Sequence, residues 1–524
     1  MKKRIYFGCL LIAASLFALC VMFTPVLAPG SEQSCNPILF LTAFLCFLLI
    51  PNVLTSFTSK FSHNSKTPLC FCSDQILFGI LFVLFFSIGI WNLLVYYPGT
   101  GGMDALAILT SPVSSVGAQH PWFYCLIVNI LLRAAFKLGG DYETALVVCS
   151  LLQIITMALV FSGILLWLRR KQIPALVWFI IASMYLLYPL FHIYSVTLLK
   201  DVPFSLMLTV WIPVLYDYWK TDGVCLKNKK WIMSCVFLIF LSLLRNNGIY
   251  VTAFTLFVML ITNPKHWRRI GSLFLVLMMV MVGSSTVERI IGIQVLFKES
   301  VGIPLQQIAA VVANDGTINE DQLAFVDKIM PLDSIRKQYN PYSVDALKWE
   351  DVRVNDWFLH THKVRFLKLW LRLFPDNPDI YLKAYLQNTY GFWALNTSDQ
   401  NGVYTSISDS YWAPWLEENQ IAVKSILPRN IQLGAESVLN WFRPFPTAGV
   451  YLWIFVTLML VLMKRRDCRI LVTAAPAIGC WLTVMISAPV AFQLRYVLSF
   501  PLAIPIIFGL LFCAEKRDTT EFLG

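Results

Sequence analysis

Runs of about 20 mostly apolar residues recur along this chain, and short polar segments separate them. A helix needs about 20 such residues to cross roughly 30 Å of hydrocarbon. The runs cover residues 5–28, 38–57, 74–96, 143–168, 173–191, 201–219, 231–245, 248–263, 269–289, 447–463, 470–488 and 496–514. They predict an all-α polytopic membrane protein with about 12 transmembrane helices. Only 14% of the residues are charged, against about 25% in soluble domains, which excludes an ordinary soluble enzyme.

The distribution of basic residues orients these predicted helices. Outside residues 290–446 the chain has 27 of its 41 Lys and Arg residues, and 21 of these 27 lie at the amino terminus or in alternate loops. Because basic loops stay on the cytoplasmic side, both termini are predicted to be cytoplasmic in a multi-pass protein of the cell membrane. Since the bases serve this orientation, no nucleic-acid partner is expected.

Residues 120–138 are apolar but are not predicted to span the membrane, because a crossing here would place Arg169, Arg170 and Lys171 outside. We interpret them as an amphipathic helix on the outer surface, within a long first outer loop, residues 97–142. The predicted organisation is two amino-terminal spans with a cytoplasmic loop (1–73), a transmembrane core (74–289), a mostly helical extracytoplasmic domain (290–446), and three spans with a cytoplasmic tail (447–524).

Six basic residues remain at the predicted outer ends of spans or in the first outer loop. They are Arg133, Lys137, Lys200, Arg245, Arg289 and Arg495. Bases are disfavoured at such positions, so the set indicates an anionic partner such as a lipid phosphate or diphosphate. The alternative is that they reach toward lipid head groups and form local ion pairs, as between Lys200 and Asp201.

Asp104 follows the third run, in the sequence YYPGTGGMDALAIL. The glycines before it allow a sharp turn, and the apolar residues after it can begin a short helix. A carboxylate at the membrane edge can act as a general base that takes the proton from an acceptor hydroxyl. The alternative is a helix N-cap without a further role.

Asp201 and Arg245 occupy two other predicted outer turns. Asp201 in LLKD is a second carboxylate that could orient an acceptor or hold a divalent cation, unless it simply pairs with Lys200. Arg245 in LLRNNG offers forked donors suited to phosphate, although Asn-Gly is also typical of an ordinary turn.

Arg495 and Tyr496 open the last run, where they could contact a phosphate or serve as interfacial anchors. His120, before Pro121, could form a hydrogen bond with a substrate or cap the surface helix. His360 and His362 form an H-x-H pair with no third ligand in view, so no metal site is predicted there.

An acid in a long first outer loop, then His-Pro, an apolar helix ending in LGGDYE, and a span followed by basic residues form a distinctive order. This layout resembles the GT-C superfamily of membrane glycosyltransferases, and among them it is most similar to the protein O-mannosyltransferases and the aminoarabinose transferases of lipid A. The resemblance implies that Asp104 is the catalytic base and Asp201 the second acid. It also implies that Arg245 and Arg495 bind the phosphate of a polyprenyl-phosphate sugar.

The resemblance covers residues 74–290 and, loosely, the last three spans. Residues 290–446, including IPLQQIAAVV, are instead similar to an uncharacterised bacterial membrane-protein family. The chain departs from the GT-C pattern because its first acid stands alone rather than in an Asp-Glu pair, two further spans precede the core, and no WWDYG-type signature is present.

The expected function is therefore transfer of a sugar from a polyprenyl-phosphate donor to a glycan, lipid or protein acceptor outside the cell. The expected substrate- and phosphate-binding residues are His120, Arg133, Lys137, Lys200, Arg245, Arg495 and Tyr496. A transporter or flippase of lipid-linked sugars would also use cations at the outer face, and a non-catalytic envelope assembly protein is a third interpretation.

Overall fold

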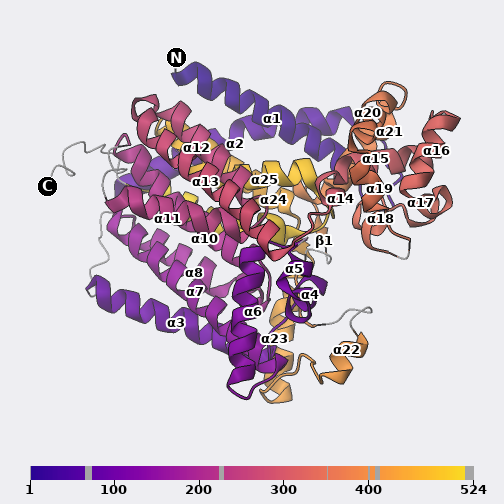
Figure 1. The fold of residues 1–524 in the computed structure, drawn as a ribbon. Coiled ribbons are helices and arrows are strands. Elements are labelled where there is room, and N and C mark those ends of the chain that lie inside the picture. The colour runs from indigo at the N-terminus through magenta and orange to yellow at the C-terminus, as the bar shows by residue number, and fades with distance from the viewer. Residues whose placement is uncertain are drawn as a thin grey trace.

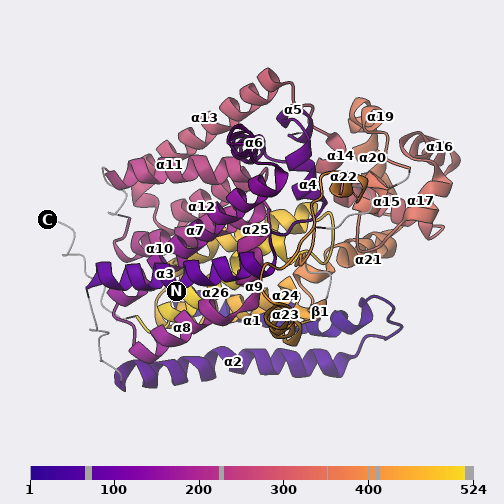
Figure 2. The same cartoon turned by 90° about the horizontal axis from the view of Figure 1, so that it is seen from below.

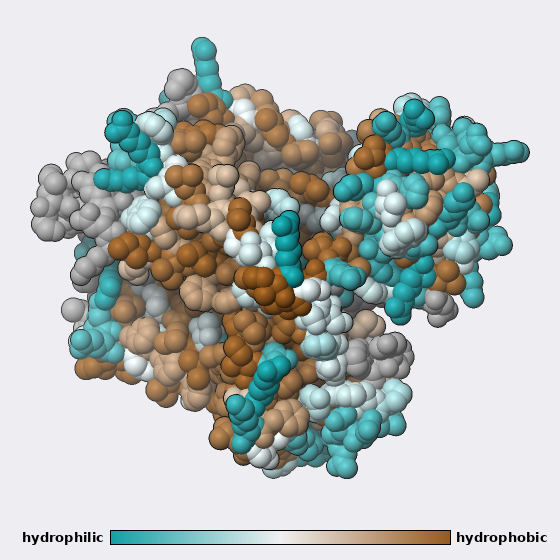
Figure 3. All heavy atoms as spheres, in the orientation of Figure 1, coloured by the Kyte–Doolittle hydropathy of each residue, from teal (hydrophilic) through white to brown (hydrophobic). Residues whose placement is uncertain are grey.

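The computed structural model describes residues 2–64, 73–117, 119–223, 229–350, 352–398, 402–407 and 413–513. Residues 65–72 of the predicted cytoplasmic loop and residues 514–524 of the predicted tail lie outside the described residues. Helices dominate and form a bundle of apolar helices with a smaller, more polar segment at one end, residues 297–388 (Figures 1 and 2). Figure 3 shows brown apolar side chains over the visible face of the bundle and teal ones over this polar segment.

Seven helical stretches among the described residues are long and apolar enough to cross a membrane. They are α1 (Lys2–Val26), α2 (Pro37–Asn64), α3 (Asp74–Val95), α7 (Tyr142–Arg170), η1 (Pro264–His266) with α13 (Trp267–Ile291), α24 (Ala448–Arg465), and η3 (Cys468–Ala474) with α25 (Ala475–Ser487). The chain is thus an all-α, multi-span membrane protein.

The other predicted runs are also helical, but they are not among these seven candidate spans. α8 (Ala175–Leu187) and α9 (Pro189–Val196) are bent by 47° and form an eighth candidate span if taken together. The bend follows from Pro189, which disfavours helical geometry at the residue before it. The remaining runs form α10 (Asp201–Lys220), α11 (Lys229–Leu244), α12 (Gly248–Thr262), and η4 (Leu494–Val497) with α26 (Ser499–Leu510). A total of 12 spans stays a prediction.

The predicted first outer loop contains three short helices, α4 (Met103–Thr110), α5 (Val113–Val116) and α6 (Trp122–Lys137). In Figure 1, α6 runs across the direction of the bundle helices, as a helix lying on a surface would. It ends at Lys137, two residues before Gly139, whose φ is +82°. Asp141 then caps α7 by accepting a hydrogen bond from the Thr144 backbone N–H at 2.9 Å.

The bundle core is built from apolar and aromatic side chains of distant helices. Phe161 of α7 lies 5.4 Å from the ring of Phe85 in α3, 4.4 Å from Tyr185 in α8 and 5.7 Å from Phe191 in α9. Because all four rings are buried, this cluster fixes α8 and α9 against α7 and so positions the link that follows α9.

The polar segment has an apolar core of its own, formed by side chains such as Val311, Phe325 and Phe366. Its helices are α14 (Phe297–Ser300), α15 (Gly302–Ala313), α16 (Glu320–Ile329), α17 (Leu332–Gln338), α18 (Asp345–Trp349), α19 (Asp356–Thr361), α20 (Lys363–Leu373) and α21 (Pro378–Asn388). Backbone hydrogen bonds attach it to the bundle, since Val344 N–H donates to Pro489 O at 2.9 Å and Ala491 N–H donates to Tyr342 O at 2.8 Å.

Residues from 390 onward pack mainly against the bundle, although the Tyr390 ring also lies 6.1 Å from the ring of Tyr342 in the polar segment. Phe392 and Phe445 belong to the bundle core. The elements here are η2 (Tyr390–Phe392), β1 (Thr397–Ser398), α22 (Ala413–Glu418), α23 (Arg429–Trp441) and β2 (Phe445–Pro446), with β1 and β2 forming a short antiparallel pair. The predicted extracytoplasmic region 290–446 therefore contains two structurally different parts.

The end of the bundle away from the polar segment, which we call the basic end, carries ion pairs between helices. Arg170 lies 2.8 Å from Asp74, Lys171 lies 2.6 Å from Asp217, and Arg469 lies 2.9 Å from Asp222. These bases are among those predicted to face the cytoplasm.

Candidate functional site

Side chains from four well-separated parts of the chain meet at the end of the bundle that carries the polar segment. We call this group the charged cluster; it consists of Asp104, His120, Lys200, Asp201, Arg245, Arg495 and Tyr496. The sequence predicted each of these as a site residue. The structure brings them together although Asp104 and Arg495 are 391 positions apart.

Backbone hydrogen bonds hold the two acidic segments side by side. Thr100 N–H donates to Val196 O at 2.8 Å, and Leu198 N–H donates to Thr100 O at 2.9 Å. The side-chain amide of Gln153 in α7 donates to Thr197 O at 2.9 Å, which satisfies a carbonyl that follows α9. The loop before α4 and the link before α10 are therefore anchored together, and this brings Asp104 close to Lys200.

Asp104 lies in the first turn of α4, whose N-cap is Gly102. The capping alternative is therefore wrong, and the carboxylate points to cations instead: Oδ2 lies 2.9 Å from Arg495 Nη1 and 3.6 Å from Lys200 Nζ. Burial alone would raise the pKa of Asp104, but the charges of Lys200 and Arg495 outweigh it and hold this pKa below its usual range.

His120 is buried and neutral. Burial, together with the positive charge of Lys200, lowers the pKa of His120 to about 3. The Lys200 ammonium donates a hydrogen bond to His120 Nδ1, so the proton of the neutral ring is on Nε2. Nε2 has no hydrogen-bond partner among the described residues, which leaves a buried donor at the cluster.

Asp201 is fully buried and faces two guanidinium groups. Its carboxylate lies 3.2 Å from Arg245 Nε and 4.0 Å from Arg495 Nη1. Arg245 also donates to the Tyr496 carbonyl at 2.8 Å and lies over the Tyr496 ring at 5.1 Å. The alternative of a mutual Lys200–Asp201 pair is wrong, because each residue pairs with a different segment.

Three residues near the cluster were not predicted from the sequence. Tyr404 lies under the Arg495 guanidinium at 5.9 Å, and Gln493 accepts a hydrogen bond from Arg495 Nε at 2.9 Å. Asp345 of α18 is close enough for the charges of Asp104 and Arg495 to act on its carboxyl. No local sequence signal marks Tyr404 or Asp345, since both reach the site through the docking of segments far along the chain.

Two predicted phosphate-binding residues lie elsewhere. Arg133 and Lys137 are exposed in the second half of α6, and no ion pair joins them to the cluster within the described ranges. Across the same ranges, no group of three or more His, Cys, Asp and Glu side chains is arranged to hold a metal ion. Asp201 instead has arginines as its neighbours.

A model of the family DUF6020, described as a family of unknown function, matches residues 110–521. The chain belongs to the DUF6020 family. The DUF6020 match includes every cluster residue from His120 onward and begins shortly after Asp104. No curated protein and no solved structure matches this chain.

The charged cluster of this DUF6020 protein contains more positive than negative charges. Lys200, Arg245 and Arg495 supply three positive charges against the two carboxylates of Asp104 and Asp201, and His120 is neutral. An excess positive charge in a partly buried site favours an anion that can accept several hydrogen bonds. The two guanidinium groups and the free His120 donor match phosphate oxygens in this respect.

Proposed function

We propose that this DUF6020 protein is a GT-C-like glycosyltransferase that moves a sugar from a polyprenyl-phosphate carrier to an acceptor at the outer face of the cell membrane. The observation that carries the proposal is the meeting of Asp104 with Lys200 and Arg495. A carboxylate next to an anion-binding group is the pair that this reaction needs, because a proton must be removed while a phosphate leaves.

In the proposed reaction, the acceptor oxygen attacks the anomeric carbon and forms the new glycosidic bond. The bond between that carbon and the carrier phosphate breaks, and the phosphate leaves with the electron pair. Asp104 takes the proton of the acceptor hydroxyl. A direct displacement of this kind inverts the anomeric centre.

Lys200, Arg495 and Arg245 would stabilise the charge that develops on the leaving phosphate. Binding of the phosphate also changes Asp104. The phosphate competes for Lys200 and Arg495, which now lower the pKa of Asp104, and its own negative charge raises this pKa toward a range in which the carboxylate is a useful base. Donor binding would thus prepare the base.

The test is turnover of a polyprenyl-phosphate sugar by the purified full-length protein in liposomes. Asp104→Asn should keep carrier binding and lose roughly 10²-fold or more in rate, as expected for removal of a general base. Asp217→Asn is the matched control, because Asp217 also pairs with a lysine but at the basic end. If Asp104→Asn turned over the carrier at the wild-type rate, the role of Asp104 as general base would be refuted. If the protein moved the carrier across the bilayer without releasing sugar, the flippase interpretation would be favoured.

A further inference from the structure

Helix α20 of the polar segment has three distinct faces. Phe366, Leu369 and Leu373 are buried in the core of the segment. A second face presents Arg365, Lys368 and Arg372 at spacings of three and four residues, and these three line a groove with α16.

The third face of α20 is apolar and exposed. Val364 is 61% exposed, Leu367 38%, Leu371 62%, and Phe374, directly after the helix, 53%. These positions also recur at spacings of three and four residues, so they form one stripe on the side away from the core. Four exposed apolar side chains in one stripe are unusual for a surface that faces only water.

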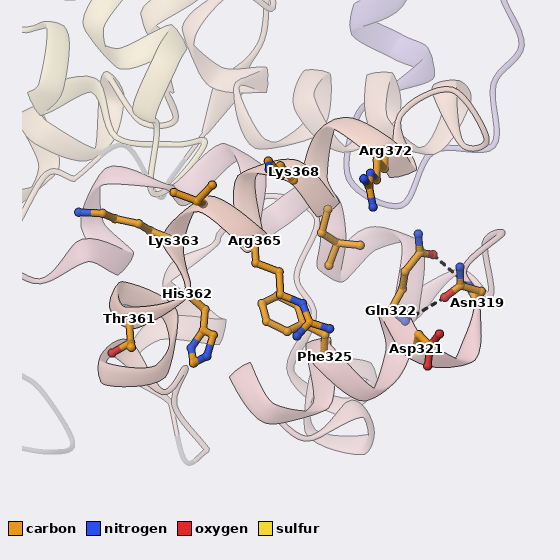
Figure 4. A pocket seen from close by; sticks show the side chains of 12 residues that line it. Asn319, Asp321, Gln322, Phe325, Thr361, His362, Lys363, Arg365, Lys368 and Arg372 are labelled. Carbon is orange, nitrogen blue, oxygen red and sulfur yellow. Dashed lines mark hydrogen bonds between the residues drawn. The ribbon is translucent and has the colours of Figure 1, made fainter.

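The basic face borders a groove of about 670 Å³ between α20 and α16 (Figure 4). Arg365 lies over the Phe325 ring at 4.4 Å, and no ion pair engages Arg365, Lys368 or Arg372 within the described ranges. Asn319 and Gln322 on the opposite wall bond to each other in a capping box. The groove therefore offers unpaired cations, with Asp321 as the single acidic residue among its lining side chains.

Helix α20 also lies on the side of the polar segment that is nearer to the apolar bundle, where a membrane surface would be. In Figures 1 and 2 it is nearer to the apolar bundle than α16 and α17, which form the far side of the polar segment. An apolar stripe beside a row of bases, on a helix of low net hydrophobicity, is the composition of helices that lie in the membrane interface.

We propose that α20 rests on the membrane surface, with its apolar stripe among the lipids and its basic face against the phosphates of anionic head groups. This contact would hold the polar segment at a fixed height above the charged cluster. It is independent of the glycosyltransferase proposal, because it requires no reaction at Asp104.

The experiment places the photoreactive residue p-benzoylphenylalanine at position 371 of the full-length protein, in vesicles of equal parts phosphatidylglycerol and phosphatidylcholine. After irradiation, mass spectrometry should find lipid adducts at position 371. The same residue at position 333, an exposed site on α17, should give none. A crosslinked dimer at 371, or no lipid adduct there, would overturn the proposal.

The basic face is tested by the ratio of phosphatidylglycerol to phosphatidylcholine adducts. Each base near an anionic surface favours the anionic lipid by about fivefold. Arg365→Gln, Lys368→Gln and Arg372→Gln together should lower the ratio at least about fivefold. Lys328→Gln with Lys337→Gln, on α16 and α17, should leave it unchanged, and an equal fall in both variants would show that α20 has no special role.

Discussion

Arg245 and Asp201 form a nearly buried ion pair in the charged cluster, with side chains 10% and 0% exposed. Taking two charges out of water is costly, and removing one partner of such a pair leaves the other uncompensated. Arg495 Nη1 lies farther from the Asp201 carboxylate, at 4.0 Å, and would therefore compensate its charge only in part. The pair is thus both a structural requirement and a part of the proposed phosphate site.

Arg245→Met should therefore lower the free energy of unfolding by about 3–5 kcal/mol, measured by denaturant titration in mixed micelles. The double variant Asp201→Asn with Arg245→Met should recover most of this loss, because it contains no unpaired charge. A double variant as unstable as Arg245→Met would mean that Asp201 is not the charge that Arg245 compensates.

Asp345 gives the polar segment a pH dependence of its own. Burial raises the pKa of Asp345 to about 6, against the opposing charge of Lys348, from 3.8 for an ordinary aspartate. The folded protein therefore holds this proton more tightly than the unfolded chain, so the contribution of Asp345 to stability is lost as the pH rises from about 4 to about 6. Asp345→Asn should remove this change.

The variant should consequently raise the melting temperature of the full-length protein at about pH 7 and have less effect near pH 4. Thermal unfolding of both proteins across this range measures the difference. Parallel curves for wild type and variant would show that the Asp345 carboxyl ionises with its ordinary pKa.

Among the connecting segments, residues 402–407 lie directly over the charged cluster. A Cβ added to Gly102 would meet the Tyr404 ring at 2.7 Å, and Gly101 N–H donates to Ser406 O at 3.4 Å. The loop before α4 and residues 402–407 therefore pack together only because Gly102 has no side chain. This close approach places Tyr404 against Arg495.

Gly102→Ala should displace residues 402–407 and cost about 1–3 kcal/mol of stability, as overpacking does. Faster hydrogen exchange in a peptide that covers residues 402–407 would report the displacement. Gly283→Ala in α13 is the control, because a Cβ there meets nothing within 4 Å and a helical alanine is favoured over glycine by about 0.5–1 kcal/mol. Equal exchange in both variants would contradict the close contact.

The elements that could be predicted are those that depend on local sequence. Each apolar run forms a helix because hydropathy and length act within the run itself. The break between α8 and α9 was not predicted, because the hydropathy of the run 173–191 does not register the effect of Pro189 on the residue before it. The position of Asp345 could not be predicted, because it depends on backbone hydrogen bonds between distant segments, such as the one from Val344 N–H to Pro489 O. The local sequence around Asp345 does not specify such a contact.

The charged cluster was predictable in part for a related reason. Asp104, Lys200 and Arg245 all lie at the ends of apolar runs that finish on the same predicted side of the membrane. The number of membrane crossings before each residue therefore predicts that the three lie at one end of the bundle. Arg133 and Lys137 satisfy the same count, yet they are exposed on α6. The direction in which a side chain of α6 points depends on which neighbouring helices α6 packs against. The number of apolar runs in the sequence does not give this information.

At the scale of the whole molecule, the ion-paired basic end and the charged cluster lie at opposite ends of the bundle. The connection between α1 and α2 belongs to the cluster end, because the Tyr342 hydroxyl of the polar segment donates to Leu27 O at 2.9 Å. Cys35, in this connection, is exposed. Its accessibility therefore reports which side of the membrane the cluster faces.

In variants that keep a single cysteine, a membrane-impermeant maleimide should label Cys35 in intact cells, and Cys72, in the predicted cytoplasmic loop, only after permeabilisation. Cys46 of α2 should stay unlabelled, because a membrane-impermeant reagent does not reach a thiol within the lipid-spanning part of a helix. The reverse pattern would place Asp104 in the cytoplasm, where water-soluble nucleotide sugars are available. The charged cluster would then bind the diphosphate leaving group of a nucleotide sugar rather than the phosphate of a lipid carrier. The side of the membrane that the cluster faces therefore distinguishes these two classes of sugar donor.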